Sequence, residues 1–337
     1  MEHIIIDGAQ GEGGGQVLRT SLTLAVLYKK SIEIRNIRSG RKKPGLMRQH
    51  LTSVMAAAQV CGAQTHGVEL GSTCIRFTPG EIKAGNYHFT IGTAGSTNLV
   101  CQTVLPILLM AKGESTVTFE GGTHNGMSPS LTFLQHSFLP VLALMGQKCD
   151  VTVESLGFYP AGGGKWTLRV KPVDTLKAFC LTEPPNPGER RVTGIVSNLP
   201  PSIVEREYAQ VVKSLDWHDA PLDRQTPRTQ GPGNTLILHA ISHTHHSIVE
   251  AVGQSGLSAE RVAKRAAGKM RKFLASNAAV DEQLADQLLI LMLLVEGCEY
   301  TTTEPTAHTL TNIKVIEQLT GRRFDCTQMT PALWRIN

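Results

Sequence analysis

The feature that most constrains the fold of this sequence is an internal repeat. A strand, a glycine-rich turn, a helix, a second strand and a second helix follow one another at residues 4–6, 8–15, 16–27, 31–37 and 44–61. The same order returns between residues 89 and 145, and a third time between residues 280 and 327. Two unrelated α/β domains in tandem are the alternative, but copies of one unit account better for the repeated order.

The spacing of the copies predicts an insertion before the third one. Their first helices align at Gln16, Asn98 and Gln283, so that 82 residues separate the first two positions and 185 separate the last two. The third copy therefore arrives about a hundred residues late. A Pro-rich shift in composition at 183–191 and a return to the helical pattern after 276–280 bracket the extra residues.

We therefore expect an α/β (α+β) fold in two parts. Residues 1–182 and 277–337 are expected to form a larger domain of three repeated units. Residues 183–276 are expected to form a smaller inserted α/β domain, with its strands and helices at residues 192–197, 202–215, 235–240, 247–252 and 258–275.

Composition and cysteine usage indicate a compartment but not a partner. The 33 Lys and Arg residues against 28 Asp and Glu residues give a formal net charge of +5, which permits an acidic partner without demonstrating one. The cysteines are scattered and form no CxxC pair, so reduced thiols and a cytoplasmic location are expected. The first ten residues lack a secretory pattern, and the longest apolar stretch, at 288–295, is too short to span a membrane. We expect no membrane association, and nothing in the sequence indicates an obligate protein partner.

The glycine-rich turn at residues 8–15 is the first candidate binding element. It lies between a strand and a helix, where backbone N–H groups and the helix dipole favour a phosphate group. It is not a Walker A motif, because it lacks the Gly-Lys-Ser/Thr ending. Glu12 inside the turn is suited to hold a divalent metal beside a polyphosphate, with a solvated turn residue as an equally weighted alternative.

A second candidate is the basic loop between Arg35 and Arg48. It contains no acidic residue, and its Lys and Arg residues stand at positions 35, 38, 41, 42, 43 and 48. Glycine and proline give this loop a defined shape and arginine forks suit phosphate, so we expect an anion-binding loop rather than a merely solvated one. A basic stripe on the helix expected at 258–275 is more typical of a solvated face than of nucleic acid binding; it consists of Arg261, Arg265, Lys269 and Lys272.

His308 is the candidate nucleophile. It stands in the segment TAHTLTN, at the beginning of the third copy's second helix, where the helix dipole disfavours a cation and keeps the imidazole neutral near pH 7. A neutral imidazole suits attack on phosphorus, although a capping or packing histidine is the ordinary alternative. Two other motifs leave their roles open. The glycines at 162–164 imply close backbone approach, either to a ligand or to another segment. The histidines at 243, 245 and 246 lack the companion ligands of a metal site, so we expect them at the surface.

Taken together, the motifs of this chain resemble those of the RNA 3′-terminal phosphate cyclases over essentially its whole length. In order they are DGAQGEGGGQVLRTSL, IRSGRKKPGLMRQHL, GTAGSTNLVCQTVLP, GFYPAGGG, TQGPGN, LADQL and HTLTN. The resemblance implies an enzyme that uses ATP and a divalent metal, Mg²⁺ or Mn²⁺, to convert an RNA 3′-phosphate into a 2′,3′-cyclic phosphate through a histidine–AMP intermediate. It also implies repeats of a four-stranded sheet and two helices, like the C-terminal domain of translation initiation factor three, with the larger domain catalytic.

The resemblance further implies roles for individual residues. His308 would take AMP, and Glu12 would assist the metal and the triphosphate. The phosphates or the RNA end would be contacted by Arg19, Arg38, Arg41 and Gln49. The adenylate would be contacted by Gln102 and by the run Gln283, Leu284, Ala285, Asp286 and Gln287, in which Asp286 is the acid. The expected partner is an RNA with a 3′-phosphate end.

Two other functions remain as alternatives. A cyclase-like protein without catalysis would act in ribosomal RNA processing on the same fold, but the presence of His308, Glu12 and the arginines favours an enzyme. An enolpyruvyl transferase uses related repeats, but it requires two comparable large halves and a longer chain.

Overall fold

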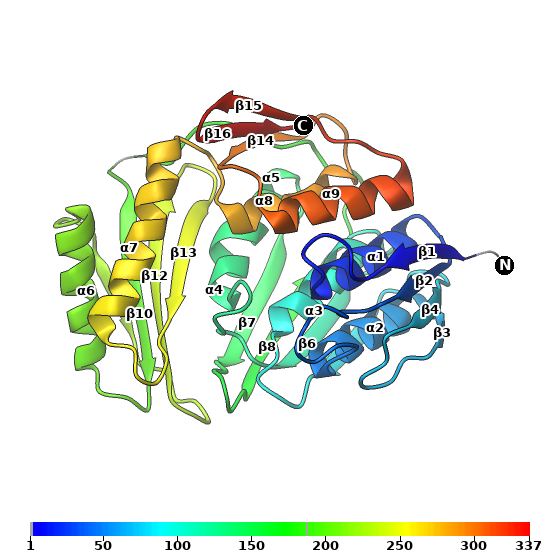
Figure 1. Ribbon diagram of the computed structural model, residues 1–337, viewed down its shortest axis with the longest axis horizontal. Helices are drawn as coiled ribbons and strands as arrows, with labels where there is room; N and C mark the ends of the chain where they lie inside the picture. Colours follow the sequence, from blue (N-terminus) through cyan, green and yellow to red (C-terminus); the bar gives the residue numbers. More distant parts are fainter. Residues whose placement is uncertain (1–2, 187) are drawn as a thin grey trace.

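The computed structural model describes residues 3–186 and 188–337 as a set of small four-stranded sheets, each with helices packed on it (Figure 1). Pro187, inside the expected boundary segment 183–191, and the first two residues lie outside the described part. The α+β fold class expected from the sequence is confirmed. No helix in the described part combines the length and the apolar character that crossing a bilayer requires.

The first repeat is a four-stranded sheet in the order β1-β2-β4-β3 with two helices. Its elements are β1 (Ile4–Asp7), α1 (Gly15–Leu27), β2 (Ile32–Arg35), α2 (Arg48–Cys61), β3 (Gln64–His66) and β4 (Ile75–Thr78). β1 and β2 run parallel, whereas β4 is antiparallel to both of its neighbours. The helix α2 begins later than its pattern suggests, because the backbone at Gly45 turns into the left-handed region and closes the basic loop by donating to the carbonyl of Ile37.

The second and third repeats have the same strand order and directions. The second sheet is β5-β6-β8-β7 and the third is β9-β14-β16-β15. The elements of the second are β5 (Asn86–Thr90), α3 (Thr97–Leu108), β6 (Ser115–Gly121), α4 (Leu131–Phe133), the π-helical turn η1 (Leu134–Phe138), α5 (Leu139–Leu144), β7 (Cys149–Ser155) and β8 (Gly164–Val170). The elements of the third are β9 (Cys180–Leu181), α8 (Glu282–Met292), β14 (Glu299–Thr302), α9 (Ala307–Thr320), β15 (Cys326–Thr330) and β16 (Leu333–Ile336).

The segment between β9 and α8 forms a sheet of its own, in the different order β11-β10-β12-β13. Its elements are β10 (Arg190–Ser197), α6 (Ser202–Leu215), β11 (Leu222–Gln225), β12 (Gly233–Ile241), β13 (His246–Val252) and α7 (Ala259–Ser276). The helices α6 and α7 pack side by side, on the outer side of the sheet in Figure 1. We propose that this segment is a domain inserted into the third repeat.

Two hydrophobic cores follow from this arrangement. The larger one joins the three repeats, and the smaller one lies between the inserted sheet and its helices. The amphipathic pattern of α7 explains the smaller core, because Val262, Ala266 and Met270 are buried while the basic side chains between them remain at the surface. The opposite face of the inserted sheet packs on the second repeat, where Ile237 and Ile248 join the larger core.

The three glycines at 162–164 approach other segments of the protein. A Cβ atom at Gly162 would lie 3.0 Å from the carbonyl oxygen of Thr93, and one at Gly163 would lie 2.3 Å from the Gln230 side chain. The motif GFYPAGGG therefore packs against GTAGST and TQGPGN. Of the two alternatives left open by the sequence, close approach within the protein accounts for these glycines.

Candidate functional site

The glycine-rich turn after β1 docks on the first turn of α9. Gly11 has a φ of +60°, and a Cβ atom there would lie 2.0 Å from Oγ1 of Thr311, so only glycine fits. The N–H of Glu12 donates to Thr311 Oγ1 at 3.0 Å, and that hydroxyl in turn donates to the carbonyl of Ala307. These bonds bring the turn beside His308, although the two segments are almost 300 positions apart in the chain.

His308 is the second residue of α9 and its ring is accessible. The helix is capped by Thr306, whose hydroxyl accepts from the N–H of Thr309. The His308 side chain is 56% exposed, and its Nδ1 lies 2.7 Å from Oε1 of Gln16 and 3.8 Å from Oε1 of Glu12. Both partners contact Nδ1, and Nε2 has no hydrogen-bond partner among the described residues.

The hydrogen bonds around Gln16 define which ring nitrogen of His308 carries a proton. Oδ1 of Asp286 accepts from the Gln16 amide nitrogen and also from Nδ2 of Asn312, at 2.8 Å. Because the amide nitrogen of Gln16 faces a carboxylate, its oxygen faces His308 and accepts a proton there. This arrangement favours the tautomer of His308 that is protonated on Nδ1, in which Nε2 carries the free lone pair.

Charged side chains surround this imidazole. Glu12, 9% exposed, forms an ion pair with Arg41, which also donates to the Glu12 carbonyl at 3.1 Å. Burial lowers the pKa of Arg19 to about 10, opposed by Asp286 and Glu12, so Arg19 stays cationic at neutral pH. Burial also raises the pKa of Asp286, opposed first by the Gln16 hydrogen bond and then by His308 and Arg19. Two cations and two carboxyl groups thus meet at the glycine turn.

Arg38 and Gln49 hold the surrounding loops in the described structure. Arg38 has a φ of +53° and donates to the carbonyls of Lys43 and Gly45, at 2.7 and 2.8 Å, so it closes the basic loop. Oε1 of Gln49 accepts from the N–H of Ser96 at 2.9 Å and ties α2 to the start of α3. Contacts of these two residues with phosphate or RNA remain predictions.

The residues predicted to contact adenylate divide between a small cavity and the core. Gln102, Asp286 and Gln287 line a cavity of about 30 Å³, which is the size of a water molecule rather than of a nucleobase. The side chains of Leu284 and Ala285 are buried in the large core. Within the described residues, Oε1 of Gln283 and of Gln287 are buried without a hydrogen-bond partner.

Three polar residues of the site were not singled out from the sequence. Gln16 connects His308 to Asp286, and Asn312 donates to the same carboxyl group. His50 packs against Gly15, where a Cβ atom would lie 2.4 Å from its Nε2. Burial, with Arg19 and Arg38 nearby, lowers the pKa of His50 to about 3. All three stand inside motifs quoted above. Their presence in those motifs could have pointed to the site, but no spacing in the sequence predicted that they lie in contact.

The side chains of this site could hold a divalent metal only together with a bound phosphate ligand. Among residues 3–186 and 188–337 there is no group of three or more His, Cys, Asp or Glu side chains placed to hold a metal ion. Glu12 is a nearly buried carboxylate at the phosphate-favouring turn. Mg²⁺ is commonly bound by one or two carboxylates together with substrate phosphates and water, and Glu12 fits that pattern.

Comparison with known proteins gives consistent matches over the whole chain. Residues 10–326 match the family described as RNA 3′-terminal phosphate cyclase. A protein of that name from Ectopseudomonas mendocina is 42% identical over 340 residues, covering 99% of this chain and 98% of that protein. Its namesakes from Koribacter versatilis and Salmonella enteritidis are 41% and 44% identical, over 96% of this chain and 92% and 95% of theirs. The solved structure of the enolpyruvyl transferase NikO from Streptomyces tendae aligns at a TM-score of 0.39 with 8% identity, over 100% of this chain and 48% of that one, which is too low to support an inference.

Proposed function

Because the chain belongs to the RNA 3′-terminal phosphate cyclase family, we propose that it converts an RNA 3′-phosphate into a 2′,3′-cyclic phosphate at the expense of ATP, through AMP bound to His308. The observation that carries this proposal is the Asp286–Gln16–His308 chain of hydrogen bonds. It holds the ring by Nδ1 beside the glycine turn and supports the proposal that Nε2, which has no partner among the described residues, is the nucleophile. A histidine that merely packs or caps would not need this support.

In the first step, Nε2 of His308 attacks the α-phosphorus of ATP, and the bond to pyrophosphate breaks. The product is a phosphoramidate on His308. The ring becomes cationic as the N–P bond forms, and the carboxylate of Glu12, 3.8 Å from Nδ1, stabilises that charge. Arg19 and Arg41 would offset the negative charge that develops on the leaving pyrophosphate.

Glu12 is the residue that would hold a divalent metal here, in exchange for its ion pair with Arg41. When bound, the metal would neutralise charge on the triphosphate oxygens. Gln283 and Gln287, whose buried amide oxygens have no partner in the described structure, would accept hydrogen bonds from the adenine ring only after side chains move, because the cavity there is the size of a water molecule.

The remaining two steps transfer the activation to the RNA. The RNA 3′-phosphate attacks the phosphorus on His308, which forms an RNA(3′)pp(5′)A anhydride and returns the histidine to its neutral form. The neighbouring 2′-hydroxyl then attacks the terminal RNA phosphorus and expels AMP. The ribose holds this hydroxyl next to the phosphate, so the last step gains from intramolecular geometry.

The proposal is tested by incubating the protein with ATP labelled on the α-phosphate, together with Mg²⁺ or Mn²⁺. Wild-type protein should acquire an acid-labile, alkali-stable label, and His308→Ala should acquire none. His66→Ala, which changes an exposed histidine of the first repeat, is the matched control and should label normally. Labelling of His308→Ala at the wild-type level would rule out this nucleophile.

A second arm follows the RNA. A 3′-phosphorylated oligoribonucleotide should yield the cyclic end, whereas the same oligomer with a 2′-deoxy terminal nucleotide should stop at the adenylylated anhydride. Cyclisation without ATP would contradict the proposed route.

A further inference from the structure

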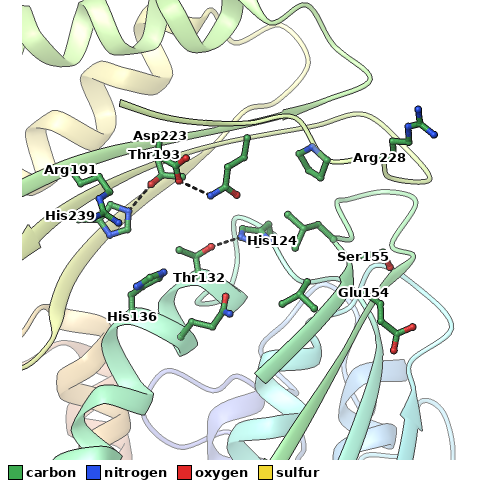
Figure 2. A pocket seen from close by; sticks show the side chains of 15 residues that line it. His124, Thr132, His136, Glu154, Ser155, Arg191, Thr193, Asp223, Arg228 and His239 are labelled. Carbon is green, nitrogen blue, oxygen red and sulfur yellow. Dashed lines mark hydrogen bonds between the residues drawn. The ribbon is translucent and has the colours of Figure 1, made fainter. Parts of the chain in front are cut away.

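A second and larger cavity lies between the inserted sheet and the second repeat. Its volume is about 470 Å³, and none of its lining residues belongs to the set around His308 (Figure 2). One wall comes from β10, β11 and β12, and the other from β7 and the helical segment of α4 and η1. The volume is in the range of pockets that bind small molecules.

Several donors in this cavity are unpartnered within the part of the chain that the structure describes. The side chains of Arg191 in β10 and His136 in η1 form no hydrogen bond or ion pair there, and neither does the side chain of Gln135, which also lines the cavity. Figure 2 shows Arg191 and His239 on one side, facing His136 on the other. Arg228 lines the far end, and its guanidinium points away.

Three imidazoles pack together beside Arg191, and one of them, His246, is half-buried rather than at the surface as the sequence predicted. The rings of His136 and His246 stack with centroids 5.1 Å apart, and the edge of His239 meets both. His239 is fully bonded, to Thr193 at 3.0 Å and to His246 at 3.2 Å. Burial is the main cause that lowers the pKa of each of the three, with Arg191 contributing, so the rings are neutral at pH 7.

The charged groups that line this cavity carry both signs. Of its two carboxylates, Glu154 is paired with Lys165 at 2.9 Å, and Asp223 accepts from Gln225 at 2.7 Å. Arg191 is left as a cation without a carboxylate partner, and its planar fork matches a phosphate. The described part of the chain holds no metal-binding group of side chains here or elsewhere, so these histidines do not form a metal site.

We propose that this cavity binds the phosphate of a nucleotide unit, with Arg191 as the charged contact and His136 and Gln135 as neutral hydrogen-bonding groups. The phosphate belongs either to the backbone of the RNA substrate or to a free nucleotide. The choice of phosphate over other anions rests on the proposed function, since both proposed substrates, RNA and ATP, carry phosphates.

The test measures binding of a fluorescent ten-nucleotide RNA with a 3′-phosphate. Arg191→Gln should weaken binding about tenfold and lower the salt slope by about 1, as expected for one lost phosphate contact. Arg191→Lys keeps the charge and should recover part of the loss. Arg261→Gln makes the same change of charge on the exposed face of α7 and should bind as wild type does.

Two further measurements distinguish RNA from a free nucleotide as the source of the phosphate, and distinguish this proposal from the proposed function. Titration calorimetry with AMP and with inorganic phosphate tests the free ligands, and loss of AMP binding in Arg191→Gln with unchanged RNA binding would assign the cavity to a free nucleotide. Labelling by α-labelled ATP should be normal in Arg191→Gln, because that reaction uses only the His308 site, so its failure would implicate the protein's fold or the proposed function instead.

Equal binding of all three probes by wild type and Arg191→Gln would overturn the proposal. It would also be overturned if Arg261→Gln weakened RNA binding more than Arg191→Gln, because the RNA would then follow the basic stripe of α7 instead.

Discussion

Gln16 is the residue on which the proposed chemistry depends beyond the nucleophile itself. Its amide links Asp286 to His308, and replacing it by alanine leaves Nδ1 of His308 without its acceptor. Loss of the hydrogen-bond partner that orients a metal-ligating histidine typically costs 10–100-fold in activity, and we expect the same order here. We predict that Gln16→Ala slows labelling by α-labelled ATP by about that factor while ATP binding persists.

The control for this prediction is Gln10→Ala, which removes an amide from the same turn that contacts Gln318 instead. A ¹⁵N NMR spectrum should show that His308 shifts from the Nδ1–H form towards a mixture only in Gln16→Ala. Unchanged labelling and an unchanged tautomer would show that Gln16 has no positioning role.

His50 predicts a dependence of stability on pH. Burial, together with Arg19 and Arg38, holds the pKa of His50 at about 3 in the folded protein, below the ordinary 6.5. Between these two values the unfolded chain binds a proton at His50 and the folded protein does not. The free energy of unfolding that the neutral His50 preserves is fully present above pH 6.5, and it declines as the pH falls towards 3. By pH 4.5 the loss is about 2–3 kcal/mol.

Urea unfolding at pH 7 and pH 4.5 checks the effect. His50→Gln should lose less unfolding free energy over this interval than the wild type, whereas exposed His66→Gln should lose as much as the wild type does. An identical loss in all three proteins would contradict the assignment to His50.

At the scale of elements, the docking of the glycine turn on α9 builds the site. Gly11→Ala would combine an unfavourable φ of +60° with a Cβ atom 2.0 Å from Thr311, so the turn must leave its place. We predict a loss of about 1–3 kcal/mol in unfolding free energy and of most labelling by ATP. Gly40→Ala, which has open space around it, is the control. Wild-type labelling of Gly11→Ala would show that the docking is dispensable.

The elements that the sequence predicted well are those whose burial pattern is local. The helix expected at 202–215 is α6, Ser202–Leu215, because its apolar stripe is complete within one segment. The strands β3 and β11 were not expected, since QTH and LDRQ lack an apolar alternation and owe their extended form to a neighbouring strand. The two-residue strand β9 is likewise defined by its pairing with β14.

The residues of the candidate site also fall into those that a local motif predicts and those that depend on packing. Glu12, Arg41 and His308 stand in recognisable motifs, and each was singled out for its local chemistry. The contact of Gln16 with Asp286 joins positions 270 residues apart and depends on how α1, α8 and α9 pack. No local pattern encodes that packing, so the support of the nucleophile was visible only in the structure.

At the scale of the whole molecule, Glu250 of β13 fastens the inserted sheet to the second repeat. Both the N–H and the hydroxyl of Ser130, the cap of α4, donate to its carboxyl group. Burial raises the pKa of Glu250 to about 7, opposed by these bonds, with Asp281 adding to the rise. The folded state thus favours the protonated acid. The contribution of Glu250 to the free energy of unfolding is therefore fully present below pH 4.5 and is lost as the pH rises through 7.

We therefore predict that Glu250→Gln is more stable than the wild type at pH 8, by up to about 3 kcal/mol, and gains little at pH 4.5. Glu304→Gln changes an exposed carboxylate and should show no such pH dependence. Equal urea midpoints of wild type and Glu250→Gln at pH 8 would contradict the burial of this acid.

The most direct measurement of the central claim is tandem mass spectrometry of the protein after incubation with ATP and Mg²⁺, read under alkaline conditions that preserve a phosphoramidate. The account predicts one AMP group, located on His308, that disappears when a 3′-phosphorylated RNA is added. AMP on any other residue, or a group on His308 that RNA does not remove, would contradict it.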